Sequence, residues 1–129
     1  MTQVHCTRAQ TAVLQVLRQQ PEPLSAQSLY KLVKKHQRMG LATVYRALDA
    51  LKRMGKVQHR VTLTGEMLYN AVEQDHHYMT CLDCGQSFPL NMCPLMNLES
   101  SLQHSNSFTI YYHTLEFFGL CEPCSAQGG

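Results

Sequence analysis

Two pairs of cysteines constrain the fold of this 129-residue chain more than any other feature of its sequence. The pairs are Cys81-x-x-Cys84 and Cys121-x-x-Cys124, and the 36 residues from 85 to 120 separate them. Each pair presents two thiolates from one tight turn, and two such turns complete a tetrahedral four-sulfur site with no open position. A closed site of this kind is structural, because the free energy of metal binding stabilises the fold. The spacing therefore predicts one structural Zn²⁺ per chain.

The termini and the hydropathy pattern indicate a cytosolic protein. The first eight residues lack the apolar core of a signal peptide, and no apolar run reaches the roughly 18 residues of a membrane span. In a reducing compartment cysteines are metal ligands more often than disulfides. A single CxxC pair would also suit a thiol–disulfide oxidoreductase, but no strand–helix context typical of one is present, so we do not expect an enzyme.

Charge is distributed very unevenly along the sequence. All eleven Lys and Arg lie within residues 1–70 beside three acids, which gives this part a formal charge of +8. Residues 71–129 contain six acids and no Lys or Arg, which gives −6. The division indicates that the first part binds a polyanion and that the second part avoids it. An unevenly solvated surface is the alternative explanation.

The basic part has the pattern of three short helices followed by a β-hairpin. The first helix is expected to begin after Thr7 and to end at Pro21–Pro23, and the second to begin after Ser25. The third is expected from residue 41 or 43 to Met54, before Gly55. Alternating apolar residues from 57 to 63, a Thr-Gly-Glu turn and a returning strand predict the hairpin. This order predicts a winged helix-turn-helix.

The third helix is amphipathic, with its polar face suited to DNA. Its predicted inward residues are Val44, Ala47, Leu48, Leu51 and Met54. The N-terminal residues of a recognition helix contact base edges and phosphates. A solvated helix face would explain the exposed Arg53 equally well. The residues that we predict to bind double-stranded DNA are Thr43, Tyr45, Arg46 and, at the start of the first helix, Arg8.

The acidic part is predicted to be a small α+β domain. We expect a short strand at residues 88–90, a helix that opens at Pro94, a strand from Phe108 to Phe118 and a disordered tail from Ser125 to Gly129. So few strands cannot bury both faces of a sheet, which predicts a homodimer. The predicted domains are 1–70 for DNA binding, 71–80 as a hinge and 81–129 for dimerisation and metal binding.

Histidines in the acidic part suggest a second metal site. His76 and His77 are adjacent, and neighbours on an extended strand point to opposite faces, so they serve different sites or only one is a ligand. A site built from His77, Cys93 and His113 is compatible with the predicted elements. A polar core or surface role is the alternative for each histidine taken alone.

These motifs together resemble the ferric uptake regulator family. The resemblance rests on the segment 41–48 (LATVYRAL), the histidine-rich junction, both CxxC pairs and the segment 113–119 (HTLEFFG), and it covers nearly the whole chain in the right order. It implies a homodimeric metalloregulator with an N-terminal winged helix, a hinge and a C-terminal dimerisation domain. The family's structural zinc carries over onto the four CxxC cysteines, its DNA-contacting tyrosine and arginine onto Tyr45 and Arg46, and its dimerisation-domain histidine onto His113.

Departures from the family pattern favour its zinc uptake regulator branch. Tyr78 replaces the second histidine of a usual His-x-His, Pro23 stands where a histidine is common, and Pro89 where a carboxylate is usual. The iron, manganese and peroxide sensors of the family rely on such nitrogen and oxygen ligands. Cys93 instead adds a soft thiolate, which favours tetrahedral zinc.

The sequence thus predicts a zinc-responsive transcriptional regulator of zinc homeostasis, either a repressor or an activator. As a metal-loaded homodimer it would bind palindromic operator DNA. We expect no membrane among its partners. An iron- or peroxide-responsive regulator of the same family is the alternative, and a CxxC thiol oxidoreductase or a zinc-ribbon interaction module are more distant ones. The candidate ligands of the regulatory Zn²⁺ are His59, His76, His77, Cys93 and His113.

Overall fold

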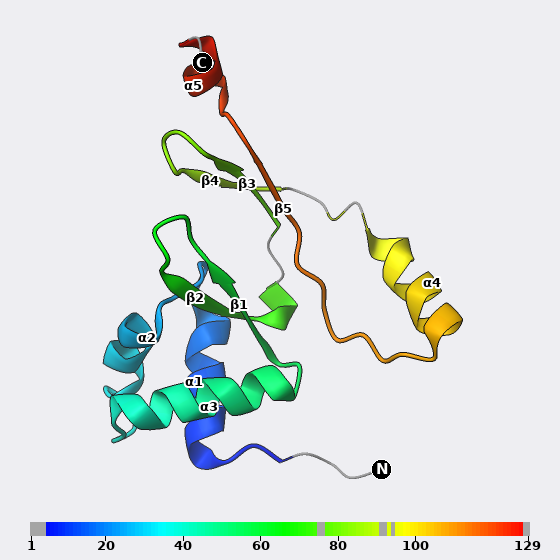
Figure 1. The fold of residues 1–129 in the computed structure, drawn as a ribbon. Helices are drawn as coiled ribbons and strands as arrows, with labels where there is room; N and C mark the ends of the chain where they lie inside the picture. Colours follow the sequence, from blue (N-terminus) through cyan, green and yellow to red (C-terminus); the bar gives the residue numbers. More distant parts are fainter. Residues whose placement is uncertain (1–4, 75–76, 91–92, 94, 128–129) are drawn as a thin grey trace. The chain divides into compact units, whose positions relative to one another are not determined.

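The computed structural model of the chain describes residues 5–74, 77–90, 93 and 95–127. The chain divides into two compact units, residues 1–75 and 76–129 (Figure 1). The boundary falls inside the segment predicted as a hinge. Within the described residues no helix has the length and apolar character needed to cross a membrane.

Three helices form most of the first unit, and local capping residues set where they begin. In α1 (Arg8–Gln19), Thr7 and Gln10 form a capping box in which each side chain accepts from the other residue's backbone N–H. Ser25 caps α2 (Ala26–Val33) with its hydroxyl, which accepts from the Ser28 N–H. The third helix, α3, spans Leu41–Arg53 and is followed by Gly55 at a φ of 73°, a left-handed conformation that glycine adopts without strain. These three helices agree with the prediction.

A two-stranded antiparallel sheet completes the first unit as the wing. Strands β1 (Val57–Val61) and β2 (Met67–Ala71) pair with His59 opposite Tyr69. Leu24, just before α2, adds an isolated bridge to the backbone of Tyr69, so the loop between α1 and α2 is attached to the wing. A short 3₁₀ helix, η1 (Val72–Gln74), follows β2.

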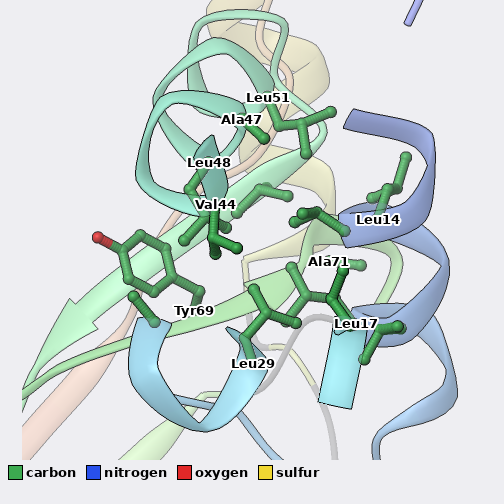
Figure 2. Packing of buried hydrophobic residues seen from close by; sticks show 14 residues of the cluster. Leu14, Leu17, Leu29, Val44, Ala47, Leu48, Leu51, Tyr69 and Ala71 are labelled. Carbon is green, nitrogen blue, oxygen red and sulfur yellow. The ribbon is translucent and has the colours of Figure 1, made fainter. Parts of the chain in front are cut away.

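The core of this unit lies between the helices and one face of the wing. Figure 2 shows side chains from α1, α2, α3 and β2 pointing into a single cluster. Fully buried residues anchor each element, and every inward residue predicted for α3 is buried except the half-buried Met54. The largest of these side chains are Leu17, Leu29, Leu48 and Leu51. The winged helix is therefore stabilised by ordinary apolar burial.

The second unit is built on a three-stranded mixed sheet. Strands β3 (Tyr78–Cys81) and β4 (Ser87–Pro89) are antiparallel, and β5 (Glu116–Gly119) lies parallel to β3 on its other side. Helix α4 (Met96–Asn106) lies between β4 and β5 in the sequence, and α5 (Glu122–Ala126) follows β5. These elements confirm the predicted α+β class, in which α4 is the expected helix; Pro94 lies outside the described residues.

Two predictions about this unit are wrong. The strand expected from Phe108 to Phe118 is a strand only over Glu116–Gly119, because its sole partner in the sheet, β3, is four residues long. The tail expected to be disordered from Ser125 instead continues α5 to Ala126. Pro123 lies in the first turn of α5, where its missing N–H costs no hydrogen bond.

Candidate metal centres and DNA-binding face

The four CxxC cysteines converge on one point of the second unit. Their sulfurs all lie within 4.8 Å of one another, and the Sγ atoms of Cys84 and Cys121 are 3.9 Å apart. Zn–S bonds of about 2.3 Å at the tetrahedral angle separate sulfurs by about 3.8 Å. The four thiols therefore fit a tetrahedral zinc ion, with no position left for water or substrate.

Each pair is shaped by the end of a strand. Cys81 closes β3, and the Cys84 N–H points at its sulfur over 3.5 Å. Gly85 completes this turn at a φ of 78° and donates its N–H to the Cys81 carbonyl. Cys121, just after β5, is the N-cap of α5 and accepts the Ser125 N–H on its carbonyl. Because β3 and β5 are parallel neighbours, their ends bring the two turns together.

The electrostatics of this centre are compatible with a bound cation. Backbone N–H groups, that of Cys121 first and that of Cys84 second, lower the pKa of the Cys81 thiol to about 6. The neighbouring Cys121 and Cys81 side chains, by contrast, raise the pKa of the Cys124 thiol. One thiolate thus forms readily while the next becomes harder to form. A divalent ion would remove this conflict, because it favours deprotonation of every ligand.

A second cluster in the same unit contains His77, Cys93 and His113. The Nε2 atoms of the two histidines are 3.1 Å apart, and the Cys93 Sγ lies 3.2 Å from the His113 Nε2. The imidazole rings are stacked, with centroids 4.7 Å apart. A tetrahedral zinc ion with typical bonds would separate two nitrogens by about 3.3 Å and nitrogen from sulfur by about 3.6 Å. Outward movements of a few tenths of an ångström would admit the ion, so these residues fit it.

Sequence reasoning missed one residue beside this cluster. The Nδ1 of His113, the nitrogen that does not face the other ligands, lies 2.5 Å from the Oε1 of Glu99 on α4. Glu99 is the only acid between Asp83 and Glu116, which was the available signal.

Five residues were predicted to bind the regulatory Zn²⁺, in what we call the sensor site. Three of them, His77, Cys93 and His113, form this cluster. His59 lies on β1 of the first unit, where the ring centroids of His59 and Tyr69 are 6.3 Å apart and the two rings are tilted by 48°. Burial, and then the charge of Lys52, lower the pKa of His59, which keeps the imidazole in the neutral form that binds metals. His76 lies outside the described residues.

The residues predicted to bind DNA lie at the starts of two helices. Thr43, Tyr45 and Arg46 occupy the first half of α3, and the Tyr45 side chain is exposed. The Arg46 guanidinium donates to the Thr43 hydroxyl over 3.2 Å, one helical turn away. Arg8 is the exposed first residue of α1. None of these four side chains belongs to the buried core, so all four are available for contact with DNA.

A winged helix joined to a cysteine- and histidine-rich α+β unit defines a class of metal-binding transcriptional regulators. A family-level sequence profile, described as "Ferric uptake regulator family", matches residues 1–118. The chain belongs to the ferric uptake regulator family.

Individual relatives include regulators with different signals. The chain is 30% identical over 109 residues to the ferric uptake regulation protein of Neisseria meningitidis, covering 83% of this chain and 76% of that protein. It is 28% identical over 127 residues to the peroxide operon regulator of Bacillus subtilis, covering 98% and 88%. The names of these relatives therefore do not select one signal.

Solved structures of the family have the same fold. The ferric uptake regulator of Vibrio cholerae superposes with a TM-score of 0.57 at 28% identity, over 92% of each chain. That of Pseudomonas aeruginosa, solved with manganese, superposes with a TM-score of 0.70 at 22% identity, over 92% of this chain and 91% of that one. At 22% identity the likeness shows the fold alone.

Proposed function

We propose that this protein is a zinc-responsive repressor that binds palindromic DNA as a homodimer. The observation that carries the proposal is the convergence of two imidazole nitrogens and one thiol sulfur, from His77, Cys93 and His113. A mixed nitrogen and sulfur set of this size suits tetrahedral Zn²⁺ better than the octahedral oxygen-rich geometry of harder cations. Cys93 is therefore the residue that selects the metal.

Two kinds of zinc would have different roles in this protein. The four CxxC cysteines would hold one ion in a closed site, where binding stabilises the second unit. The His77, Cys93 and His113 cluster offers three ligands, so a fourth position is left for water or another side chain. Such a site exchanges its ion more readily and is the better sensor. His59 from the first unit and His76 are the candidates for the remaining ligand.

A homodimer is supported by an exposed apolar face of the second unit. Met79 is the centre of a cross-strand row, with Phe88 opposite it on β4 and Phe117 opposite it on β5. All three side chains are exposed, and they line one apolar hollow of about 460 Å³. The resemblance to the family implies a homodimer, and a second copy of the chain would cover this face.

DNA binding is assigned to the first unit. Its formal charge of +8 over residues 1–70 attracts phosphates, and exposed polar residues begin α3. Arg46 would contact a guanine or a phosphate, and Thr43 and Arg8 would contact phosphates. Tyr45 would contact a thymine methyl group or a phosphate. In a dimer the two α3 helices would enter successive major grooves of a palindrome.

The switch follows from the division of the chain into two units. If His59 supplies the fourth ligand, the site draws on both units and binds metal best in one arrangement of them, so metal shifts the population toward that arrangement. The arrangement favoured by zinc would be the one in which both recognition helices reach their grooves. Repression would then follow from occupancy of the operator.

A mobility-shift titration tests the metal response. The sample is dimer that keeps its four-cysteine zinc but is otherwise depleted of metal, mixed with operator DNA selected from a random library. Added Zn²⁺ should tighten binding at least tenfold in wild type and leave Cys93→Ser unchanged. Cys6→Ser, a thiol outside both clusters, is the matched control and should respond like wild type. Equal affinity with and without zinc would overturn the proposal.

The same titration separates zinc from the other signals of the family. The relatives named for ferric uptake and for a peroxide operon make iron or peroxide response the second candidate. Rescue of DNA binding by Fe²⁺ but not by Zn²⁺ would select it. Zinc content per chain should fall from two ions to one in both Cys93→Ser and His113→Ala.

The DNA-binding assignment has its own test. Arg46→Ala should weaken binding to the selected operator by about 5- to 150-fold, because one contact to a base or phosphate is lost. Arg53→Ala removes the same charge from the last turn of the same helix and is the control, with an expected change below threefold. Equal losses of DNA affinity in the two variants would mean that Arg46 contributes through net charge alone and makes no specific contact.

A further inference from the structure

We propose that Glu99 is a positioning residue for the sensor site, which orients His113 for metal without binding the metal itself. This inference rests on the proposed zinc sensor. Its basis is the 2.5 Å contact between the Glu99 carboxylate and the His113 Nδ1. Among the residues that the structure describes, the Glu99 side chain forms no other hydrogen bond, so this contact fixes its position.

The geometry assigns different roles to the two nitrogens of His113. Nε2 faces the other ligands, at 3.1 Å from the His77 Nε2 and 3.2 Å from the Cys93 sulfur. Nδ1 is on the other side of the ring and faces Glu99. A carboxylate only accepts hydrogen bonds, so it holds the proton on Nδ1 and leaves the Nε2 lone pair free for an ion.

The same geometry separates Glu99 from the ligands. Its carboxylate and an ion on Nε2 would lie on opposite edges of the His113 ring, so such an ion cannot contact Glu99 directly in this arrangement. The pair is partly exposed, with 21% of the His113 side chain and 32% of the Glu99 side chain accessible. Solvent screening therefore limits the effect of the charge, and the main effect of Glu99 is orientation.

Helix α4 orients a second ligand as well. The backbone N–H of Leu95, the N-cap residue of α4, points at the Cys93 sulfur over 3.4 Å. Glu99 follows four residues later, in the first turn of the helix. One rigid element thus fixes both a thiol and an imidazole, which prepares the two ligands for metal.

A cobalt titration tests this role. Co²⁺ is added to dimer whose four-cysteine site holds zinc, and the sulfur-to-cobalt charge-transfer band reports occupancy through Cys93. Glu99→Ala should weaken Co²⁺ binding by about 10- to 100-fold while the saturated band keeps its intensity. Glu99→Gln should weaken it less than tenfold, because an amide oxygen still accepts from Nδ1. Ser100→Ala, the exposed neighbour on α4, is the control and should stay within twofold.

Each other outcome overturns a distinct statement. Absence of a second cobalt site in wild type would overturn the proposed sensor and with it the role of Glu99. A wild-type site with unchanged affinity in Glu99→Ala would overturn the positioning role alone. Equal losses in Glu99→Ala and Glu99→Gln would assign the effect to charge instead of orientation. A melting temperature of metal-depleted Glu99→Ala well below that of wild type would make Glu99 a structural residue.

Discussion

The two units of the molecule are stabilised in different ways. The first unit has a continuous cluster of buried apolar side chains drawn from all three of its long helices and the wing. In the second unit the buried residues among those described are His77, Thr80 and Cys81, while large apolar side chains such as Phe117 are exposed. Because this unit has so little apolar core of its own, we expect it to be stabilised by metal and by a partner copy.

Loss of the four-cysteine zinc should produce the largest effect. Cys84→Ser removes an exposed ligand, so it changes metal binding with little change in packing. We expect the second unit to lose nearly all amide hydrogen-exchange protection, because its fold depends on the ion, while the first unit keeps its own. Cys6→Ser is the control. Protection that persists in a zinc-free second unit would break the contrast between the units.

The reverse experiment removes apolar burial from the first unit. Leu48 is fully buried at the centre of α3, and Leu48→Ala should cost about 2–5 kcal/mol of unfolding free energy. Zinc content should stay at the wild-type value, because the ligands of both clusters lie in the second unit. Leu63→Ala is the same substitution at an exposed leucine and should change stability by less than about 0.5 kcal/mol. Denaturant unfolding followed by circular dichroism measures the unfolding free energy of both variants.

Substitution on the exposed face of the sheet tests whether a second copy covers it. Met79→Glu places a charge between Phe88 and Phe117, and a charge in a dry interface is strongly unfavourable. The dimer dissociation constant should rise at least 100-fold in analytical ultracentrifugation. Val61→Glu adds the same charge at an exposed apolar residue of the first unit, so that variant should remain dimeric. A Met79→Glu variant that is still dimeric would mean that another surface forms the interface.

Most of the first unit could be predicted because its signals are local. Thr7, Ser25 and Gly55 lie within a few residues of the helix ends that they define, and apolar spacing marks the buried faces. The four-cysteine centre was equally accessible, since the CxxC spacing encodes the turn that holds each pair. In both cases the residues within a few positions of a feature were sufficient to predict it.

The shortened strand and the missed contact of Glu99 in the second unit have a common physical cause. The length of β5 depends on its partner β3, which lies more than thirty residues earlier, so strand propensity over residues 108–115 was misleading. The contact of Glu99 with His113 depends on the path of the chain after α4. Long-range pairing of this kind leaves no periodic trace in the sequence. Membership of His59, which lies in the first unit, and of His76, which lies outside the described residues, stays a prediction.

A surface ion pair at the end of the first unit gives the smallest expected effect. The Arg18 guanidinium donates to the Glu73 carboxylate on η1, which lowers the pKa of Glu73 below its usual value near 4.5. A lowered carboxyl pKa stabilises the fold above the unfolded-state pKa, and that contribution is lost as pH falls through the folded-state pKa. Both side chains are about half exposed, so Glu73→Gln should cost only about 0.2–1 kcal/mol at pH 7. The cost should fall away as the pH drops through the lowered folded-state pKa of Glu73, and Glu22→Gln, at an exposed acid of the same unit, is the control. A cost that stays constant with pH would assign the effect to packing at the end of the wing instead of charge.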